Sequence, residues 1–465
     1  MTDSPGTMAT GTPGFFHPAS RPYRFIVLLF ASLLPLGSYF AYDSIGAIST
    51  ILVEQLGISR AAIGNLYTVY SIAAIGTLLV GGILIDVLGT RKASLLFSSL
   101  VVLGAAIVAL SDTAPVQAIG AMILGPGQEH RATYWAMVAG RFLFGAGSES
   151  MIVAQSSIFA RWFKGKELAL AFGIGLTVSR IGTLFTFNTE ALIAKEFGGY
   201  RAALWAAVFL CLASLAANVV YVILDRRGER ILALKEEGVE EKIRLADIGA
   251  FPRSYWYVTL LCVTFYSAIF PFTALSTDFF HEKWGLPLAV ESGGGFFAQA
   301  FGNFLHMFST APGTTSIIIF ASMVFAPFAG SLVDRIGRRA TLMVFGSLLM
   351  IPSYLLLAYT HVPPTIPMIL LGAAFVLVPA AMWPSVALVV DEKRVGTAYG
   401  LMTMIQNIGL ALFPYLNGKL RDVTHDYTAS MLMFASLGVV GLVFALLLRI
   451  ADAREGGRLE RPSAT

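Results

Sequence analysis

Long apolar runs separated by short polar loops dominate this 465-residue sequence. The runs Phe25–Phe40, Tyr200–Leu224 and Met431–Leu448 each approach the roughly 20 residues that a helix needs to cross a bilayer. We place twelve such spans, at residues 24–52, 60–86, 92–111, 133–158, 167–194, 201–224, 254–280, 313–333, 340–360, 366–390, 395–420 and 428–449. The pattern therefore predicts an all-α membrane protein with twelve transmembrane helices.

Composition supports a membrane protein and argues against an enzyme. Hydrophobic residues make up 56% of the chain and charged residues 13%, whereas a soluble domain carries roughly 25% charged residues. The two cysteines, Cys211 and Cys262, lie inside apolar runs, and the six histidines are scattered singly. No phosphate-binding loop, metal-ligand cluster or Ser/His/Asp arrangement stands out. We therefore expect no enzymatic activity, no cofactor and no bound metal.

The positions of the basic residues predict how the chain is oriented. Most of the 32 Lys and Arg residues fall in the two tails and in the loops on the side of the N-terminus. Cytoplasmic loops are enriched in Lys and Arg, so we expect both termini in the cytoplasm. The net charge of +4 then reflects topology and gives no reason to expect nucleic-acid binding.

The polar stretch in the middle of the chain divides the spans into two groups of six. We expect a disordered cytosolic tail (1–23), an N-terminal six-helix bundle (24–224), a cytoplasmic linker with a short surface helix (225–253), a C-terminal six-helix bundle (254–449) and a second cytosolic tail (450–465).

Short motifs recur in the two predicted bundles. Gly81–Lys92 (GGILIDVLGTRK) ends the second span, and Gly330–Arg339 (GSLVDRIGRR) ends the eighth. A second pair of motifs places Asn407 where the first bundle has Arg180. Internal repetition of this kind is typical of transporters built from two related halves.

These motifs resemble those of a known family. The loop at Gly81–Lys92, its repeat, and RFLFGAG at Arg141–Gly147 resemble the loop and fourth-helix signatures of the major facilitator superfamily. The resemblance implies two pseudo-symmetric six-helix bundles that move relative to each other around a binding site near the middle of the membrane.

Other segments resemble one branch of this superfamily, whose animal members are lysosomal dipeptide transporters. They are Tyr42–Ala47, Gly140–Ser150, Arg161–Leu168, Ser179–Gly182, Asp225–Leu232, Ala381–Ala387 and Gly396–Ala411. The N-terminal tail has no acidic dileucine signal, and the chain has no Asn-x-Ser/Thr site. We therefore expect a bacterial-type relative in the inner (plasma) membrane, and the sequence does not indicate an accessory subunit.

Two opposite charges inside the spans are the main candidates for substrate binding. A charge within a transmembrane helix costs at least about 2.5–3.5 kcal/mol and usually faces a cavity or a partner. A dipeptide zwitterion carries an ammonium and a carboxylate roughly 7 Å apart, which Glu149 and Arg180 can bind separately, the arginine through two parallel hydrogen bonds. The resemblance implies this role for both residues. The alternative is an ion pair that locks two helices or forms a gate.

The second bundle offers neutral polar and aromatic groups instead of charges. Asn407 is the counterpart of Arg180, and the other pocket candidates are Gln406, Tyr67, Tyr70, Tyr266, Trp383 and Tyr399. For each aromatic residue the alternative is packing or anchoring at the membrane interface.

Other charged residues are predicted to have structural or gating roles. Arg141 matches the fourth-helix arginine of the superfamily, and Asp43 is its expected partner. The loop pairs Asp86 with Arg91 and Asp334 with Arg338 are expected to hold the halves together when the protein faces outward.

Two outer loops look inserted, at 113–132 and 285–312. Within the second, Gly293–Phe308 has apolar residues at helical spacing, which predicts a helix on the outer membrane interface. A lid over the outward-facing cavity is the alternative.

Together these features predict a transporter of short peptides, chiefly dipeptides, that works by alternating access as a uniporter or a proton-linked carrier and functions as a monomer. One alternative is a carrier of small organic anions that Arg180 and Arg141 would clamp, although Glu149 would repel such a substrate. A ligand-binding membrane sensor or scaffold is the alternative outside transport.

Overall fold

Helices account for all the regular structure among the described residues. The computed structural model describes residues 16–125, 127–163, 167–232, 249, 251–290, 295–391 and 394–461. The helices are α1 (Arg21–Ser32), α2 (Leu36–Ala47), α3 (Ser49–Leu56), α4 (Arg60–Ala109), α5 (Ala114–Leu124), α6 (Glu129–Phe163), α7 (Leu168–Phe197), α8 (Tyr200–Leu232), α9 (Arg253–Thr273), α10 (Ser276–Trp284), α11 (Phe296–Leu305), the 3-10 helix η2 (Met307–Ser309), α12 (Ala311–Ile336), α13 (Arg339–Tyr359), α14 (Thr365–Val389), α15 (Val395–Thr424) and α16 (Thr428–Arg454).

Each predicted span coincides with helical structure. The first span corresponds to α1–α3, the seventh to α9 and α10, and α4 contains both the second and the third. Within α4, Gly89 has φ 76° and ψ 158°, so the helix breaks there. A positive φ is readily accessible to glycine because it has no Cβ.

Nine helical segments of the described residues are long and apolar enough to cross a membrane. The helices α6 and α15 are not among them, and these carry the candidate polar residues Arg141, Glu149, Gln406 and Asn407. In α12, the described apolar segment is Ala311–Ala326, which is shorter than the nine segments above.

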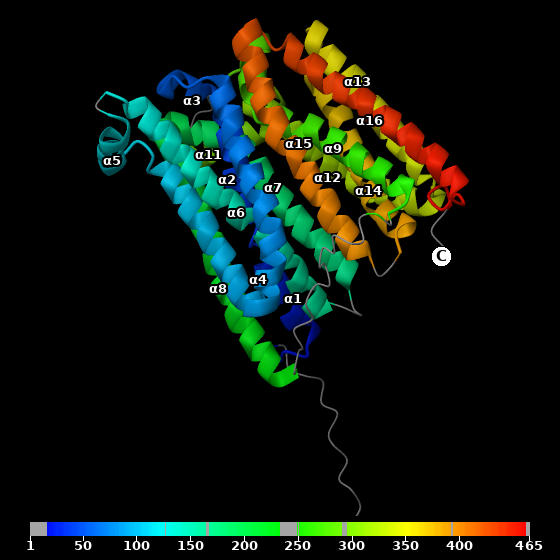
Figure 1. Ribbon diagram of the computed structural model, residues 1–465. Helices are drawn as coiled ribbons and strands as arrows, with labels where there is room; N and C mark the ends of the chain where they lie inside the picture. The colour runs from blue at the N-terminus through cyan, green and yellow to red at the C-terminus, as the bar shows by residue number, and fades with distance from the viewer. Residues whose placement is uncertain are drawn as a thin grey trace, which may run out of the picture.

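The chain forms two helical halves, α1–α8 and α9–α16, which lie beside each other (Figure 1). They pack together mainly through α4 against α15 and α7 against α12. We call the end of the bundle that carries residues 57–59, 198–199 and 425–427 the closed end; it is uppermost in Figure 1.

Glycines allow the backbones of the two halves to touch near the closed end. A Cβ on Gly64 of α4 would lie 2.1 Å from the carbonyl oxygen of Pro414 in α15. A Cβ on Gly418 would lie 2.1 Å from the carbonyl oxygen of Arg60. Small residues of this kind permit close helix approach in lipid.

Both insertions contain a helix at their centre. The prediction of a helix within 293–308 is confirmed by α11, whose Phe296 ring contacts Phe197 at the end of α7, 5.2 Å between centroids. The first insertion forms α5, which packs on α6. That α11 lies on the membrane interface stays a prediction.

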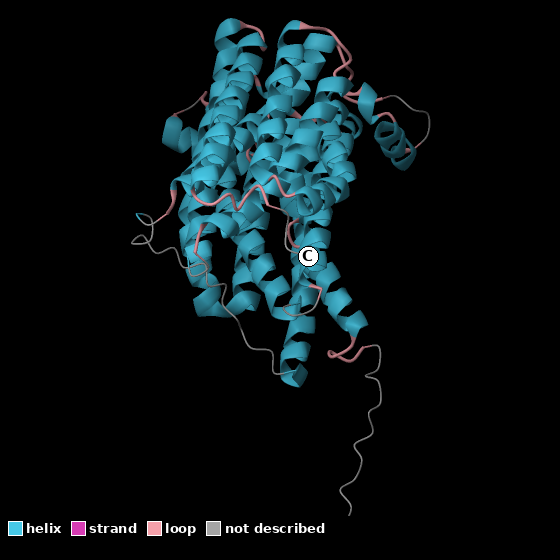
Figure 2. Cartoon of the chain, turned by 90° about the vertical axis from the view of Figure 1, so that its right-hand side faces the viewer, coloured by secondary structure: helices cyan, strands magenta, loops and turns pink. Residues whose placement is uncertain are grey.

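The segment after α16 folds back onto the second half. Leu459 is fully buried, and Glu460 accepts hydrogen bonds from the backbone N–H and the hydroxyl of Thr341 at the start of α13, both 2.9 Å. Figure 2 shows the loops and helix ends from the side of the second half. The predicted N-terminal tail up to residue 15 and most of the predicted linker, 233–248, lie outside the described residues.

Candidate functional site

Glu149 is held by contacts within the first half. The phenol of Tyr70, on α4, donates to Oε1 of Glu149 at 2.7 Å and lies 3.0 Å from the hydroxyl of Ser148. Ser148 in turn pairs with Ser38 of α2 at 2.6 Å. Among the described residues no cation lies within ion-pair distance of Glu149, and its side chain is partly exposed. The carboxylate is therefore oriented but not neutralised.

Arg180 reaches across to the second half. Its Nη1 donates to the hydroxyl of Ser322 on α12 at 2.8 Å, and its guanidinium lies over the ring of Phe375 on α14, 5.3 Å from the centroid. Ser322 donates its own hydrogen to the carbonyl of Ile319 at 2.7 Å, so its oxygen is free to accept. No described carboxylate lies within ion-pair distance of Arg180.

The two charges therefore do not form the ion pair that was the alternative to substrate binding. Both residues belong to the first half; Glu149 is held within that half, whereas Arg180 also contacts Ser322 and Phe375 of the second half.

An aromatic cluster adjoins Arg180 in the second half. Trp383 donates from Nε1 to the phenol of Tyr266 at 3.0 Å, and Tyr399 donates to the carbonyl of Trp383 at 2.9 Å. Tyr266 stacks on Phe270 at 5.7 Å, and Phe375 packs edge-on against both rings. The structure thus brings together the predicted residues Tyr266, Trp383 and Tyr399 and joins them to Arg180 through Phe375.

Other predicted pocket residues lie in packed surroundings. Gln406 is 9% exposed and accepts from the thiol of Cys262 at 3.4 Å; Asn407 is 2% exposed and donates to the carbonyl of Thr403 at 3.1 Å. Tyr67 is 1% exposed and packs on Arg141, 5.0 Å from its ring centroid to the guanidinium. These three side chains are not assembled with Arg180.

The expected ion pair between Asp43 and Arg141 is not formed. Four aromatic rings, those of Tyr42, Tyr67, Tyr70 and Phe144, surround the Arg141 guanidinium at 5.0–5.4 Å. It also donates to the carbonyls of Ala41 at 3.3 Å and Leu66 at 3.4 Å. Asp43 faces α7, where Thr183 donates to it at 2.7 Å. Ring faces and carbonyls stabilise the cation in place of a carboxylate.

Arg91 lies in a charge cluster at the opposite end from the closed end. It forms ion pairs with Asp225 (3.7 Å) and with Glu229, both near the end of α8, and Arg161 contacts the same two acids at 3.3 and 3.5 Å. The side chains of Asp86 and Asp334 lie outside the described set, so their predicted pairs are untested. Arg338 is exposed and precedes α13 with a left-handed φ of 43°.

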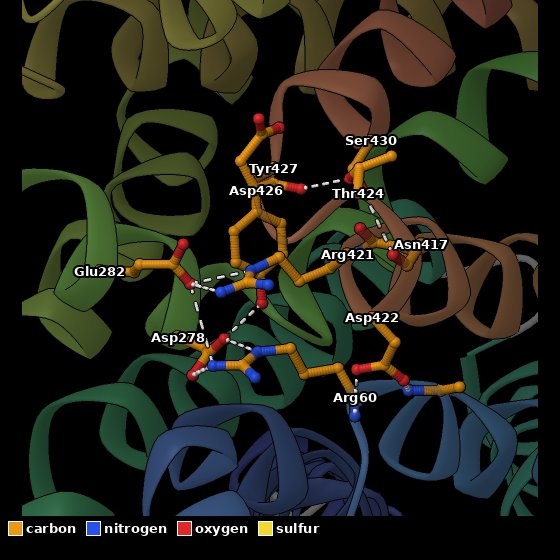
Figure 3. A network of polar contacts seen from close by, with 11 residues as sticks. Arg60, Asp278, Glu282, Asn417, Arg421, Asp422, Thr424, Asp426, Tyr427 and Ser430 are labelled. Atoms are coloured by element: carbon orange, nitrogen blue, oxygen red, sulfur yellow. Dashed lines mark hydrogen bonds and ion pairs between the residues drawn. The ribbon is translucent and has the colours of Figure 1, made fainter.

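A network at the closed end joins the two halves and was missed by the sequence reasoning (Figure 3). Arg60, at the start of α4, pairs with Asp278 of α10 at 2.5 Å. Asp422 of α15 accepts from the backbone N–H groups of Arg60 and Ala61, at 3.2 and 2.9 Å.

Further contacts extend this network within the second half. Arg421 pairs with Glu282 at 2.8 Å, and the phenol of Tyr427 donates to Asp278 at 2.5 Å. We call the six residues Arg60, Asp278, Glu282, Arg421, Asp422 and Tyr427 the closed-end latch. Acidic and basic residues at the ends of adjoining spans were the only sequence signal for it.

Comparison with known proteins agrees with this architecture. The chain is 33% identical over 457 residues to the lysosomal dipeptide transporter MFSD1 of Danio rerio and 32% identical over 459 residues to that of Homo sapiens. These alignments cover 95% and 96% of this chain and 90% of each relative.

Solved structures give the same fold. A bacterial homologue of the human lysosomal transporter Spinster, in an inward-facing and occupied conformation, superimposes with a TM-score of 0.68 at 15% identity, covering 96% of this chain and all of that one. The sequence profile of the Major Facilitator Superfamily matches residues 31–314 and 296–464. The chain therefore belongs to the major facilitator superfamily of membrane transporters.

Proposed function

We propose that this transporter carries short peptides, chiefly dipeptides, across the membrane by alternating access. Two of the relatives that match nearly the whole chain are named as dipeptide transporters. The observation that carries the proposal is the pair Glu149 and Arg180, two partly exposed opposite charges that no described residue neutralises.

The chemistry of a dipeptide suits this pair. Its carboxylate would accept two parallel hydrogen bonds from Arg180, which Ser322 and Phe375 hold in place. Its ammonium would donate to Glu149, which Tyr70 orients. The two ends of an extended dipeptide lie roughly 7 Å apart. Because affinity would come mainly from the two termini, we expect broad tolerance of side chains, which would contact Tyr266 and Trp383.

The closed end would be the outer side of the membrane. This follows from the excess of Lys and Arg in the tails and loops at the other end, which we propose to be cytoplasmic. Residues 24–224 and 254–449 would be the two moving units, and the closed-end latch would hold the outer side shut. We propose a uniporter in an inner (plasma) membrane, because no buried carboxylate pair or histidine relay stands out in the part of the chain that the structure describes.

The alternative substrate is a small organic anion. The observation in its favour is that Arg180 has no described carboxylate partner. Glu149 argues against it, because a carboxylate facing the same substrate would repel an anion.

Uptake into liposomes that contain the purified protein distinguishes these substrates. Labelled dipeptides, single amino acids and dicarboxylates are compared with and without a pH gradient, for the native protein, Glu149→Gln and Arg180→Ala. Glu129→Gln, an exposed acid at the start of the same helix α6, is the matched control. We expect dipeptide uptake to fall in both site variants and to persist in the control. Unchanged dipeptide uptake in both variants would overturn the site, and preferred dicarboxylate uptake would establish the anion carrier.

A further inference from the structure

A small cavity lies inside the first half, enclosed by α2, α4, α6 and α8. Its volume is about 20 Å³, and its walls are apolar except for Ser44 and Arg141. One water molecule needs roughly 10–15 Å³ of such space and two to four polar partners. The cavity is therefore large enough for one water and has two polar groups on its wall.

Arg141, which lines this cavity, has an unused hydrogen-bond donor. The side chain is 2% exposed, and its Nε and Nη1 donate to carbonyls while aromatic rings cover its faces. Its Nη2 has no acceptor among the described residues. An unpaired N–H of a buried cation is unfavourable, so an acceptor from outside the chain is expected.

Ser44, which also lines the cavity, has an unused acceptor. Its hydroxyl donates to Oε1 of Glu190 on α7 at 2.9 Å, so the oxygen lone pairs remain available. Glu190 is completely buried, and its Oε2 has no hydrogen-bond partner among the described residues. The cavity thus separates a buried cation from a serine that is bonded to a buried acid.

We propose that one ordered water molecule occupies this cavity and connects Arg141 to Glu190 through Ser44. The water accepts from Nη2 of Arg141 and donates to Oγ of Ser44, and its second hydrogen can go to the backbone carbonyl of Ala41, a lining residue whose carbonyl lies 3.3 Å from Nη1 of Arg141. Glu190 is then the buried acid linked to Arg141, a role that Asp43, bonded to Thr183, does not fill.

A neutral ligand fits better than an ion of either sign. The Arg141 guanidinium repels a cation. An anion would lie beside a serine whose hydrogen is committed to Glu190, and the acid would repel it. Water supplies both the acceptor that Arg141 needs and a donor for Ser44.

Filling the cavity tests the proposal by thermal unfolding of the full chain in nanodiscs. Ala207 is 3% exposed and lines the cavity from α8. Ala207→Val would displace the water and leave Nη2 unpaired, so we expect the Tm to fall by about 1–3 °C. Ala207→Ser, the matched variant, places an oxygen in the same space and should keep the Tm near that of the native protein.

A dry apolar cavity would give the opposite result, since added methyl groups would then leave the Tm unchanged or raise it. To separate steric overpacking from lost solvation of Arg141, Ala207→Val is also introduced into an Arg141→Met variant. The decrease in Tm caused by Ala207→Val should disappear there, because no guanidinium remains to be solvated. A high-resolution cryo-EM map should show density between Arg141 and Ser44. No density there, an unchanged Tm in Ala207→Val, or a Tm that depends on replacing chloride by gluconate at constant ionic strength would overturn the proposal.

Discussion

Arg141 and Arg180 show how the surroundings of a residue determine its role. Both are guanidinium groups inside transmembrane helices. Arg141 is enclosed by four aromatic rings and donates to two carbonyls, whereas Arg180 is partly exposed and, among the described residues, is held by Ser322 and Phe375. Arg141 therefore has a structural environment, and Arg180 keeps donors free for a ligand.

This difference leads to a prediction for Arg180→Lys. Lysine keeps the charge but loses the planar fork that binds a carboxylate through two hydrogen bonds. We expect the KM for dipeptide uptake to rise about tenfold or more, because a hydrogen bond to a charged group contributes about 1.5–3 kcal/mol, while the Tm stays unchanged. The measurement is uptake against dipeptide concentration. Arg141→Lys, the comparison, should lower the Tm instead, and an equal loss of Tm in both variants would contradict the assignment.

The sequence indicates Glu149 and Arg180 as candidates, because charges inside apolar spans are costly and therefore conspicuous; their role in binding stays a prediction. The sequence could not identify their partners. Ser322 is 142 residues from Arg180 along the chain, and whether the two side chains meet depends on the rotation and register of α7 and α12. The same limit explains why Asp43 was paired with Arg141 and why Phe375 was overlooked.

At the scale of helices, the start of α4 depends on the other half of the molecule. The first N–H groups of a helix lack partners within the helix, and those of Arg60 and Ala61 donate to Asp422 of α15. One carboxylate thus caps a helix and joins the two halves at the closed end.

We predict that Asp422→Asn shifts the protein away from the conformation described here, because the substitution removes the negative charge of the side chain and so weakens the cap of α4. Spin labels at the exposed positions His130 and His361, introduced as cysteines, would report a longer distance across the closed end. The native cysteines are buried. Asp426→Asn is the matched control: it is exposed and caps only Thr428 of its own half at 2.7 Å. Equal shifts in both variants would rule out a specific role for Asp422.

The contact of α4 with α15 gives a second prediction at this scale. Gly64→Ala would place a methyl group against the Pro414 carbonyl. Overpacking costs about 1–3 kcal/mol, which changes the balance between conformations by roughly fivefold to a hundredfold. We expect slower dipeptide uptake and a longer distance in the same spin-label experiment. Gly76→Ala in the same helix, where a Cβ meets nothing within 4 Å, should behave like the native protein.

Helices were predictable where apolar runs are long, and less so where tertiary contacts decide their ends. The twelve spans follow from hydrophobicity alone. The breaks between α1 and α2 and between α9 and α10, and the helix α5 within the first insertion, were not predicted. Pro35 precedes α2 and was a visible signal. The fit of α5 on α6, where Gly120 packs against Ala132, depends on packing that no local pattern reveals.

For the whole molecule, the two halves share a fold but contribute different chemistry. The first half supplies both charges, and the second supplies Ser322 and the aromatic cluster that contact Arg180. A dipeptide bound by both charges, with its side chains against Tyr266 and Trp383, would therefore connect the halves, and its two ends can be tested separately.

We predict that, when one end of the dipeptide is chemically blocked, mutating the residue that binds this end no longer lowers the affinity. An N-acetylated dipeptide should bind less tightly to the native protein but lose nothing further in Glu149→Gln, because the ammonium is already absent. A C-terminal amide should behave in the same way with Arg180→Ala. Competition with labelled dipeptide uptake measures both effects. Additive losses in the matched pairs would contradict the proposed orientation of the substrate.

The closed-end latch also bears on how fast the transporter can turn over. An empty carrier must reopen its closed end before it can reload, and nothing bound compensates for the Arg60–Asp278 ion pair and the Asp422 cap, which join the two halves and would separate in that step. A carrier that returns loaded has the substrate bridging its halves during the same step. Vesicles preloaded with unlabelled dipeptide should therefore take up labelled dipeptide faster than empty vesicles, so that the protein works more rapidly as an exchanger than in net flux.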